Sequence, residues 1–456
     1  MPRYTMKDCA GKVLIIVQNL PVPFDRRVWL EAKTLRDYGL HVSIISPKSK
    51  DFSKSFEKIE DIAVYRYKMP IEAHGVPGYF FEFIYAWLAT AFLSIRVWFQ
   101  EGFDVIQACN PPDTYWVLGQ IYRLFGVTFI FDHHDLSPEM FDAKYHGKRL
   151  LRRGLVWLEK KTLKNATLVL STNHSYKNIA IERGGKNPQD VYVVRTGPDV
   201  QRLQTVRPEP PLKFGKKYLV CYLGEMCPQD GVDLLLKAIL YFITKLGRTD
   251  THFVLIGGGP AMPAMRALRD EMGLQQNVTF TGRIPDTDLC RYLSTADVCV
   301  DPDPWTEWAN HSTMNKILEY MTFGKPIVAF DLDEHKNSAH EAAFYVQPND
   351  TRLFAEAIDE LLKNPEKRQA MGRIGYARIR GQLAWTHTHK ALVAAYNRLF
   401  PEMKSADEAE QHLLDFVLSG IHRKAYTDAE NVNILPRDKG KSASSQKAEQ
   451  ISCDSH

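Results

Sequence analysis

Short apolar runs alternate with longer amphipathic stretches along this chain as far as residue 400. Uninterrupted apolar runs separated by helical stretches are typical of parallel strands that are covered by helices on both faces. The pattern therefore predicts two successive sets of strands in a parallel α/β fold. The expected strands are 12–17, 41–46, 63–68, 104–108, 128–131, 168–171 and 191–194 in the first half, and 218–223, 252–256, 278–281, 298–300, 326–330 and 343–346 in the second.

A proline-rich break separates the two halves. Residues 205–217 hold three prolines and no periodic pattern, which is typical of a linker. We therefore expect an N-terminal Rossmann-like domain on the acceptor side over 1–204 and a C-terminal Rossmann-like domain that binds the nucleotide over 218–380. A closing helix should follow at 381–402, and a polar, largely disordered tail at 403–456. Open parallel sheets bind ligands beyond the carboxyl ends of their strands, so we expect the site in the cleft between the lobes.

Two segments raise the question of a membrane. Residues 80–99 are mostly aromatic and aliphatic and are long enough to span a bilayer, but they include Glu82 and Arg96. Because strands are predicted on both sides of this segment, we expect a buried or surface-lying helix rather than a span. Residues 144–164 contain eight Lys or Arg against the single acid Glu159. Such a run is either a solvated helix face or a surface for anionic lipids.

Composition narrows the function. The net charge of +4 is too small to indicate a nucleic-acid partner, and the seven cysteines are scattered without a Cys-x-x-Cys pair, which fits a reducing, cytoplasmic compartment. No signal peptide is expected, since the apolar run at 13–17 is too short. The turn Gly257-Gly-Gly-Pro260 lacks the dinucleotide fingerprint and there is no P-loop, which disfavours nicotinamide, flavin and P-loop enzymes.

The stretch 310–331 holds the strongest candidate for a phosphate site. It predicts a polar loop, a helix that begins at Ser312 or Thr313 and ends at Gly324, and then a strand. The N-terminus of such a helix presents unpaired N–H groups and a positive dipole end to an anion. Two turns further on, Glu319 either faces the same cleft, where it can accept hydrogen bonds from sugar hydroxyls, or lies on a solvated face.

A second polar cluster, Asp132-His-His-Asp135, follows the strand 128–131 and is predicted to be a loop at the cleft. Adjacent residues project in different directions, so one histidine should meet the substrate while its neighbour packs. A hydrogen bond to an aspartate would then fix the tautomer of that histidine. A metal site is not expected here, nor at Asp301-Pro-Asp303, where the prolines favour a rigid turn at the end of a strand.

Five motifs in the second half carry a family resemblance. They are Tyr222-Leu-Gly224, Asp230-Gly-Val-Asp-Leu-Leu-Leu-Lys-Ala238, Leu255-Ile-Gly-Gly-Gly-Pro260, Asn277-Val-Thr-Phe-Thr-Gly-Arg-Ile-Pro285 and Leu318-Glu-Tyr-Met-Thr-Phe-Gly-Lys-Pro-Ile-Val-Ala329. In this order they resemble the retaining glycosyltransferases of family GT4, which have the GT-B fold of two Rossmann-like parallel α/β domains facing a central cleft. Asn110-Pro-Pro-Asp113, with His134-Asp135, is similar to the branch that builds bacterial surface polysaccharides and O-antigens.

The resemblance implies transfer of a sugar from a nucleotide-diphospho-sugar to a lipid-linked or polysaccharide acceptor, with retained configuration and without a metal or other cofactor. UDP and GDP donors fit it equally. It places Glu319 at the ribose, Arg283 and Ile284 at the base, and His134 with Asp135 at the reaction centre. The other residues that it implies at the donor are His311, Ser312, Thr313, Met314, Asn315, Lys316 and Gly224.

The chain departs from the family pattern at three donor-side positions. Glu225 and Asp230 stand where family members carry Arg and Lys, and His311 stands where they carry Glu. At about 4 Å, each of the two acids would repel a diphosphate by about 1–4 kcal/mol. We expect the helix dipole and Lys316 to compensate. The other candidate cations are Arg26, Arg27 and Arg195.

The departures leave two alternatives to an active enzyme of surface-polysaccharide synthesis. One is a catalytically weakened scaffold or binding subunit of a polysaccharide assembly complex, and the other is a GT-B nucleotide-sugar epimerase. We expect the active glycosyltransferase. It should be cytoplasmic and peripheral on the inner membrane face, with 80–99 and 144–164 against an anionic membrane surface.

Overall fold

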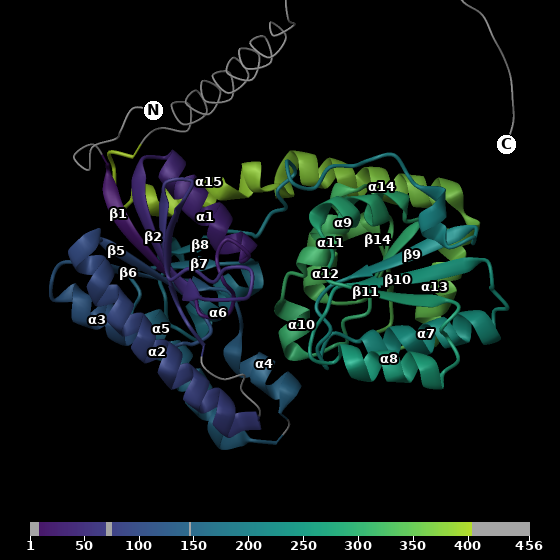
Figure 1. Cartoon of the computed structure of the whole chain (residues 1–456), viewed down its shortest axis with the longest axis horizontal. Coiled ribbons are helices and arrows are strands. Elements are labelled where there is room, and N and C mark those ends of the chain that lie inside the picture. Colours follow the sequence, from purple (N-terminus) through teal and green to yellow (C-terminus); the bar gives the residue numbers. More distant parts are fainter. Residues whose placement is uncertain (1–8, 70–74, 146, 404–456) are drawn as a thin grey trace, which may run out of the picture. The chain divides into compact units, whose positions relative to one another are not determined.

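The computed structural model describes residues 9–69, 75–145 and 147–403, and these form two parallel sheets flanked by helices (Figure 1). The first sheet has the strand order β3-β4-β2-β1-β5-β6-β7-β8 and is parallel except for the β3–β4 pair. Its strands are β1 (Gly11–Ile16), β2 (Leu40–Pro47), β3 (Phe56–Ile59), β4 (Ile62–Tyr67), β5 (Val105–Cys109), β6 (Thr128–His133), β7 (Leu168–Ser171) and β8 (Val191–Val193).

The second sheet is parallel throughout, in the order β11-β10-β9-β12-β13-β14. Alternate residues of its strand β9 enter different cores, with Leu219 and Cys221 on one face and Val220 and Tyr222 on the other. A sheet that is buried on both faces needs apolar residues at successive positions, which explains the continuous apolar runs. The predicted parallel α/β fold class is confirmed. The strands are β9 (Tyr218–Leu223), β10 (Thr251–Ile256), β11 (Val278–Gly282), β12 (Val298–Asp301), β13 (Ile327–Phe330) and β14 (Ala343–Val346).

Strand β3 is absent from the predicted set. It pairs with β4 through a two-residue turn at Glu60 and Asp61, whose φ angles are 46° and 66°. Positive φ at both central positions is the geometry of a type I′ turn, which Asn or Gly usually signals. Because two acidic residues form this turn and β3 is exposed at alternate positions, neither an apolar run nor a turn motif marks the hairpin.

The long apolar segment forms helix α2 (Gly75–Gln100), which packs along one face on the first lobe. Ala86, Thr90, Ser94 and Val97 are fully buried. Within the described residues, its stretch Phe81–Gln100 is the one helix long and apolar enough to cross a membrane. The other helices of this lobe are α1 (Arg26–Asp37), α3 (Trp116–Arg123), α4 (Ser137–Lys144), α5 (Arg149–Asn165) and α6 (His174–Glu182).

The chain returns to the first lobe after the second sheet. A π-helical turn, Ile379–Leu383, separates α14 (Pro365–Arg378) from α15 (Trp385–Asn397). On α15, the indole of Trp385 donates to Thr34 Oγ1 at 3.0 Å and the Tyr396 hydroxyl donates to Gln107 Oε1 at 2.6 Å. The predicted tail lies outside the described residues, apart from Met403. The helices of this half are α7 (Val232–Thr244), α8 (Met262–Glu271), α9 (Asp286–Thr295), α10 (Glu307–His311), α11 (Asn315–Thr322), α12 (Asp333–Ala339), α13 (Thr351–Lys363), α14 (Pro365–Arg378) and α15 (Trp385–Asn397).

Candidate active site

The cluster Asp132-His-His-Asp135 is only half a loop. Strand β6 continues through Asp132 and His133, which pair with Leu170 and Ser171 of β7, so the predicted loop 132–135 is wrong in its first two residues. The sequence did not indicate a strand here because the side chains are polar, whereas the hydrogen bonds between strands are made by the backbone. Side chains alternate along a strand, and Asp132 and His134 therefore project on the same side while His133 projects on the other.

His133 is a packed residue. It is fully buried, its ring lies 5.1 Å from that of Phe131 and 5.2 Å from that of Tyr176, and its Nε2 lies 3.5 Å from a carboxylate oxygen of Glu159. The expectation that one of the two histidines packs is confirmed. His134 is the one that reaches the edge of the sheet, with a side chain that is 14% exposed.

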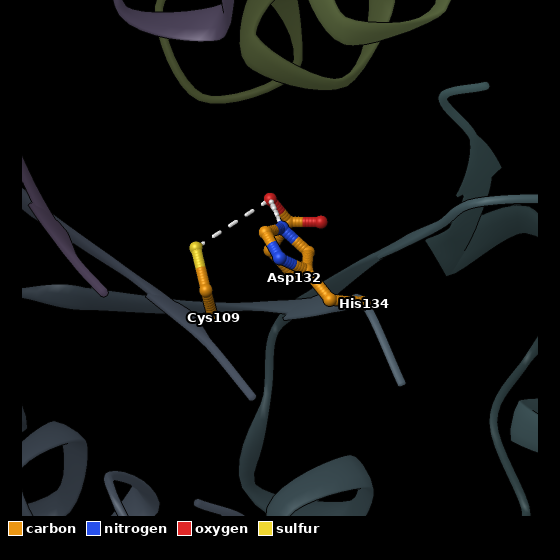
Figure 2. Close-up of side chains that lie close together, drawn as sticks. All are labelled: Cys109, Asp132 and His134. Carbon is orange, nitrogen blue, oxygen red and sulfur yellow. Dashed lines mark hydrogen bonds and ion pairs between the residues drawn. The ribbon is translucent and has the colours of Figure 1, made fainter. Parts of the chain in front are cut away.

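His134 is held from two sides. Its Nε2 lies 2.8 Å from Asp132 Oδ2, and its backbone N–H donates to Asn110 Oδ1 at 2.7 Å (Figure 2). The contact with Asp132 is a close approach of the carboxylate to the ring nitrogen without an aligned hydrogen bond. The aspartate that orients the histidine is thus Asp132. Asp135 is bound through its backbone to Asn110, and its predicted catalytic role stays a prediction.

Asp132 belongs to a buried charged network. Its Oδ1 accepts from Arg27 at 2.7 Å and its Oδ2 accepts from Gln107 at 3.0 Å. Glu31 lies 3.1 Å from the same arginine and accepts from Gln107 at 2.7 Å. All of these side chains are at least nine-tenths buried.

The two acids of this network have opposite charge states. Burial disfavours ionisation of Asp132, but the charges of Arg27 and His134 outweigh it and hold its pKa well below the ordinary value. Burial raises the pKa of Glu31 well above its ordinary value, and although Arg27 opposes the rise, the charge of Asp132 adds to it. We infer that Arg27 and Asp132 are the ion pair and that Glu31 is the acid that keeps its proton.

Cys109 completes a group that resembles a metal ligand set. Its Sγ lies 3.8 Å from Asp132 Oδ2, and Cys109, Asp132 and His134 each offer a donor atom within 4.8 Å of the others (Figure 2). Burial and the charge of Asp132 raise the pKa of the thiol well above its ordinary value, so it stays protonated. The guanidinium of Arg27 sits on the same carboxylate and opposes a second cation. The arrangement suits a hydrogen-bonding network that positions His134.

Glu319 lies at the other side of the cleft, on α11. Its Oε1 accepts from Arg26 of the first lobe at 2.7 Å and from Arg202 at 3.1 Å. The same two arginines reach Asp286 Oδ1, at 3.4 Å and 2.6 Å. The side chain of Glu319 is only 11% exposed, so it lies at the contact between the lobes rather than on a solvated face.

Lys316, one turn before Glu319, is also paired. Its Nζ lies 2.7 Å from Asp303 Oδ1 and 3.3 Å from Asp301 Oδ1, and its side chain is 11% exposed. Burial opposes ionisation of Asp301, but Lys316 lowers its pKa, whereas burial and Asp301 raise the pKa of Asp303 well above the ordinary value. The ammonium is therefore balanced by an ionised carboxylate. The role of Lys316 as a diphosphate ligand stays a prediction.

Helix α11 begins later than predicted. Its first residue is Asn315, its N-cap is Met314, and no side chain caps it. Ser312 and Thr313 follow the short helix α10 instead and fasten the loop to the first lobe. The Ser312 hydroxyl lies 2.9 Å from that of Tyr176, and Asn173 donates to the Thr313 hydroxyl at 3.0 Å. The prediction was wrong because the short helix α10 comes directly before these residues, and the sequence pattern did not indicate α10.

The remaining predicted residues lie around the same edge of the second sheet. Arg283 is exposed and its guanidinium lies 5.0 Å from the ring centre of Phe24 in the first lobe. Gly224 packs directly against Gly257 of the glycine turn. A Cβ on Gly257 would lie only 1.8 Å from the Gly224 carbonyl oxygen, so a side chain does not fit there. Ile284 packs against the core, His311 Nδ1 lies 2.8 Å from the Glu307 carbonyl oxygen, and Asn315 is exposed.

Several residues of the site escaped the sequence reasoning. Gln107, Arg202, Asn173 and Tyr176 carried no motif, and their partners lie far away in the chain. Asn110 was quoted only for the resemblance, yet it is buried and its Oδ1 accepts the backbone N–H groups of both His134 and Asp135. Its position directly after β5 was the available signal.

Two family profiles match the chain. One, described as "Glycosyltransferase Family 4", matches residues 25–202, and the other, described as "Glycosyl transferases group 1", matches residues 217–364. The first stretch covers the first lobe from α1 onwards, without β1, and the second covers all strands of the second sheet; the two are separated by residues 203–216, at the proline-rich segment.

Curated relatives and a solved structure agree with these matches. The alpha-D-kanosaminyltransferase of Streptomyces kanamyceticus is 31% identical over 34% of this chain and 38% of its own length. A GDP-mannose-dependent monoacylated alpha-(1-6)-phosphatidylinositol monomannoside mannosyltransferase of Corynebacterium glutamicum is 26% identical over 42% of this chain and 51% of its own length. The chain thus spans about half or less of these relatives. The structure of Anabaena Alr3699/HepE in complex with UDP and glucose superimposes with a TM-score of 0.64, at 16% identity, over 85% of this chain and 100% of that one.

Proposed function

This chain belongs to glycosyltransferase family 4, and from that premise we propose that it transfers a sugar from a nucleoside-diphospho-sugar to a hydroxyl group of an acceptor, with retention of the anomeric configuration. It has the GT-B fold that the sequence predicted. The observation that carries the proposal is that the start of α1 links two polar groups of different lobes: Arg27 pairs with Asp132, which lies beside His134, and Arg26 pairs with Glu319 of the second lobe.

In this proposal each group has a role. Glu319 accepts the ribose hydroxyls, and the backbone amides at the start of α11 and near Gly224 meet the diphosphate, whose charge grows as it leaves. His134, held beside Asp132, lies next to the sugar. In front-face substitution, the bond from the anomeric carbon to the phosphate oxygen breaks, the acceptor oxygen bonds to the same face, and a phosphate oxygen takes the acceptor's proton.

An acceptor anchored in a membrane is supported by the outer face of α2. Its side chains at Phe81, Leu88, Phe92, Ile95 and Phe99 recur on one side of the helix and are between 53% and 82% exposed. Exposed apolar residues at such spacing form a stripe that favours the boundary of a bilayer. The named activity of the Corynebacterium relative, which acts on a phosphatidylinositol mannoside, supports a glycolipid or lipid-linked glycan as the acceptor.

The charge of helix α5 fits an anionic lipid surface. The helix itself carries six basic residues and one acid, and that acid, Glu159, is buried and paired with Arg183 at 2.7 Å. Leu150 and Trp157 are exposed on the same helix, at 80% and 53%. We therefore infer a cytoplasmic enzyme that docks on the inner membrane face with the first lobe and works in surface-polysaccharide or glycolipid synthesis.

Thermal stabilisation by nucleotides tests the donor site. UDP, GDP, ADP and dTDP are each added without metal to the wild type, to Glu319→Ala and to Glu366→Ala, which removes an exposed acid on α14. A nucleotide at 100 times its Kd stabilises by about 2.7 kcal/mol. One responding nucleotide, lost in Glu319→Ala and kept in Glu366→Ala, supports the proposal and identifies the base. A response that survives Glu319→Ala removes the ribose role.

A second function has one observation in its favour. Glu225 and Asp230 line the donor edge, and Lys316 is already bound to carboxylates, so a nucleotide sugar bound there would meet more repulsion than in other family members. A donor-binding subunit of a polysaccharide assembly complex, without turnover, accommodates that charge pattern. Incubation with the responding nucleotide's sugars separates the two functions, because the scaffold binds the donor and releases neither free nucleotide nor glycosylated product.

A further inference from the structure

The cations that the sequence offers for the donor diphosphate are already engaged. Lys316 lies 2.7 Å from Asp303, Arg26 lies 2.7 Å from Glu319, and Arg27 lies 2.7 Å from Asp132. Arg195 donates to Ser338 Oγ at 3.0 Å and lies 3.5 Å from Glu334, and Arg202 lies 2.6 Å from Asp286. Each of these five cations thus has its own partner, and none of them contacts Glu225 or Asp230 directly. Arg283 also lies at this edge, with its guanidinium 5.0 Å from the ring centre of Phe24.

A nucleoside diphosphate brings at least two negative charges to this edge. Asp230 is buried, and desolvation raises the pKa values of both Glu225 and Asp230, with Arg283 and Lys316 opposing the rise at one carboxyl each. Where ionised carboxylates remain, the diphosphate is repelled. A site of this charge needs a cation that is free to bind phosphate.

Lys144 has the required position. It is the last residue of α4, the helix that follows the His134–Asp135 loop, and α4 packs against α10 of the second lobe. Its side chain is exposed and has no hydrogen-bond or ion-pair partner within residues 9–69, 75–145 and 147–403. Helix α10 leads directly into the loop before α11, so this packing brings α4 of the first lobe to the donor side of the second. In keeping with that position, the ammonium opposes the rise in pKa at Asp135, Glu225 and Asp230.

The helix that carries Lys144 is well anchored. Glu139, in its first turn, is almost fully buried and lies 2.5 Å from Arg183, and the Ser137 hydroxyl donates to Asp113. A lysine at the end of a rigid helix loses little conformational freedom beyond that of its own side chain when it binds a ligand.

We propose that Lys144 is a ligand of the donor diphosphate, supplied by the first lobe across the cleft in place of the cations missing at positions 225 and 230. This inference rests on the proposed function. Because the cation and the helix amides belong to different lobes, diphosphate binding then ties the lobes together, and the donor contributes to closing the cleft over the acceptor.

Calorimetric titration measures the affinities for UDP and GDP. Competition against the bound diphosphate measures the affinities for uridine and guanosine. Lys144→Gln is compared with Lys144→Arg and with Lys390→Gln, which removes one exposed, unpartnered charge on α15 among the described residues. We expect Lys144→Gln to weaken the diphosphate about tenfold, equivalent to about 1.4 kcal/mol. Nucleoside affinity should not change, since a nucleoside has no phosphate. Lys144→Arg should stay within about threefold of the wild type, because it keeps the charge.

The outcomes separate this inference from the proposed function. Equal diphosphate affinities of Lys144→Gln and Lys390→Gln would overturn the role of Lys144 while leaving the donor site intact. An equal loss for nucleoside and diphosphate would show a damaged fold and also overturn it. A wild type that binds neither UDP nor GDP overturns the proposed donor site, and this inference with it. Adding Glu225→Gln to Lys144→Gln should restore part of the affinity, because one repelling charge is removed.

Discussion

The buried network under His134 makes a prediction that does not depend on the reaction. Arg27 is ion-paired with Asp132 at 2.7 Å, and Glu31 lies 3.1 Å away with its proton retained. Asp132→Asn removes the charge that keeps Glu31 protonated. Glu31 should then ionise and take over the pairing with Arg27. Glu31→Gln, by contrast, replaces a neutral acid by a neutral amide of the same shape, which can still donate to Asp132.

The magnitudes follow from what each variant leaves buried. Glu31→Gln should cost less than about 1 kcal/mol, because no charge changes. Asp132→Asn should cost about 1–3 kcal/mol, the usual loss when a buried hydrogen-bond partner is altered. The double variant leaves the guanidinium of Arg27 buried without a carboxylate, with only the Val194 carbonyl at 2.6 Å and the Thr196 hydroxyl at 3.0 Å. Breaking a buried ion pair costs about 3–5 kcal/mol, so the double variant should lose more than the sum of the two single ones, by at least about 1 kcal/mol.

Urea unfolding followed by circular dichroism measures all four proteins, with free energies taken from the shift in midpoint at constant slope. The pH dependence gives a second reading. The folded-state pKa of Glu31 is raised, so its contribution to stability is complete below the ordinary glutamate pKa and declines as the pH rises through the folded value. Relative to the wild type, Glu31→Gln should therefore gain stability as the pH increases.

Two results would refute this assignment of charge. If Glu31→Gln costs as much as Asp132→Asn at pH 7, Glu31 is an ionised partner of Arg27 in the wild type. If the double variant loses only the sum of the single losses, Glu31 does not replace Asp132. A His134→Gln variant should behave as the wild type in stability, since its side chain is partly exposed at the edge of the network.

Three further predictions test other parts of the molecule. Burial raises the pKa of Asp113 to about 7, so its contribution to stability is full below the ordinary aspartate pKa and is lost as the pH rises through 7; Asp113→Asn should flatten the fall in melting temperature between pH 5 and pH 8, and an unchanged slope contradicts this. Arg26 is 47% exposed and pairs with one carboxylate oxygen of Glu319. Because such an exposed pair is worth about 0.2–1 kcal/mol, Arg26→Ala should tighten nucleotide binding by up to about fivefold. Weaker binding would make Arg26 a ligand of the nucleotide instead. Phe92→Asp with Phe99→Asp should abolish co-sedimentation with phosphatidylglycerol vesicles while leaving the melting temperature unchanged, and binding that persists would place the membrane contact elsewhere.

The fold was predictable because buried strands require apolar residues at successive positions. Strands such as β1 and β9 are buried on both faces and therefore appear as unbroken apolar runs. The prediction failed where the backbone, not the side chains, makes the strand. In β6 the ladder continues under Asp132 and His133, and in β3 the turn at Glu60 and Asp61 adopts positive φ without Gly or Asn.

The residue types of the site were predictable, but their partners were not. Glu319 and His134 stood out because each follows a strand or a helix start in a recognisable motif. That Asp132 rather than Asp135 lies beside His134 depends on the alternation of side chains in a strand that the sequence did not reveal. The pairing of Lys316 with Asp301 and Asp303 depends on two turns that meet only in the folded chain.

The acids at positions 225 and 230 show why charge cannot be judged from one lobe. Within the second lobe they replace family cations and add repulsion at the donor edge, where Lys316 is already paired with two aspartates. Glu319, however, takes its partner Arg26 from the first lobe, and the desolvated carboxyls of Glu225 and Asp230 are opposed by Lys144, also from the first lobe. A comparison of motifs within the second lobe shows only the cations that are missing there. Because both lobes line the donor site, a cation of the first lobe can make up part of the positive charge that the second lobe lacks, and such an exchange ties donor binding to the approach of the lobes.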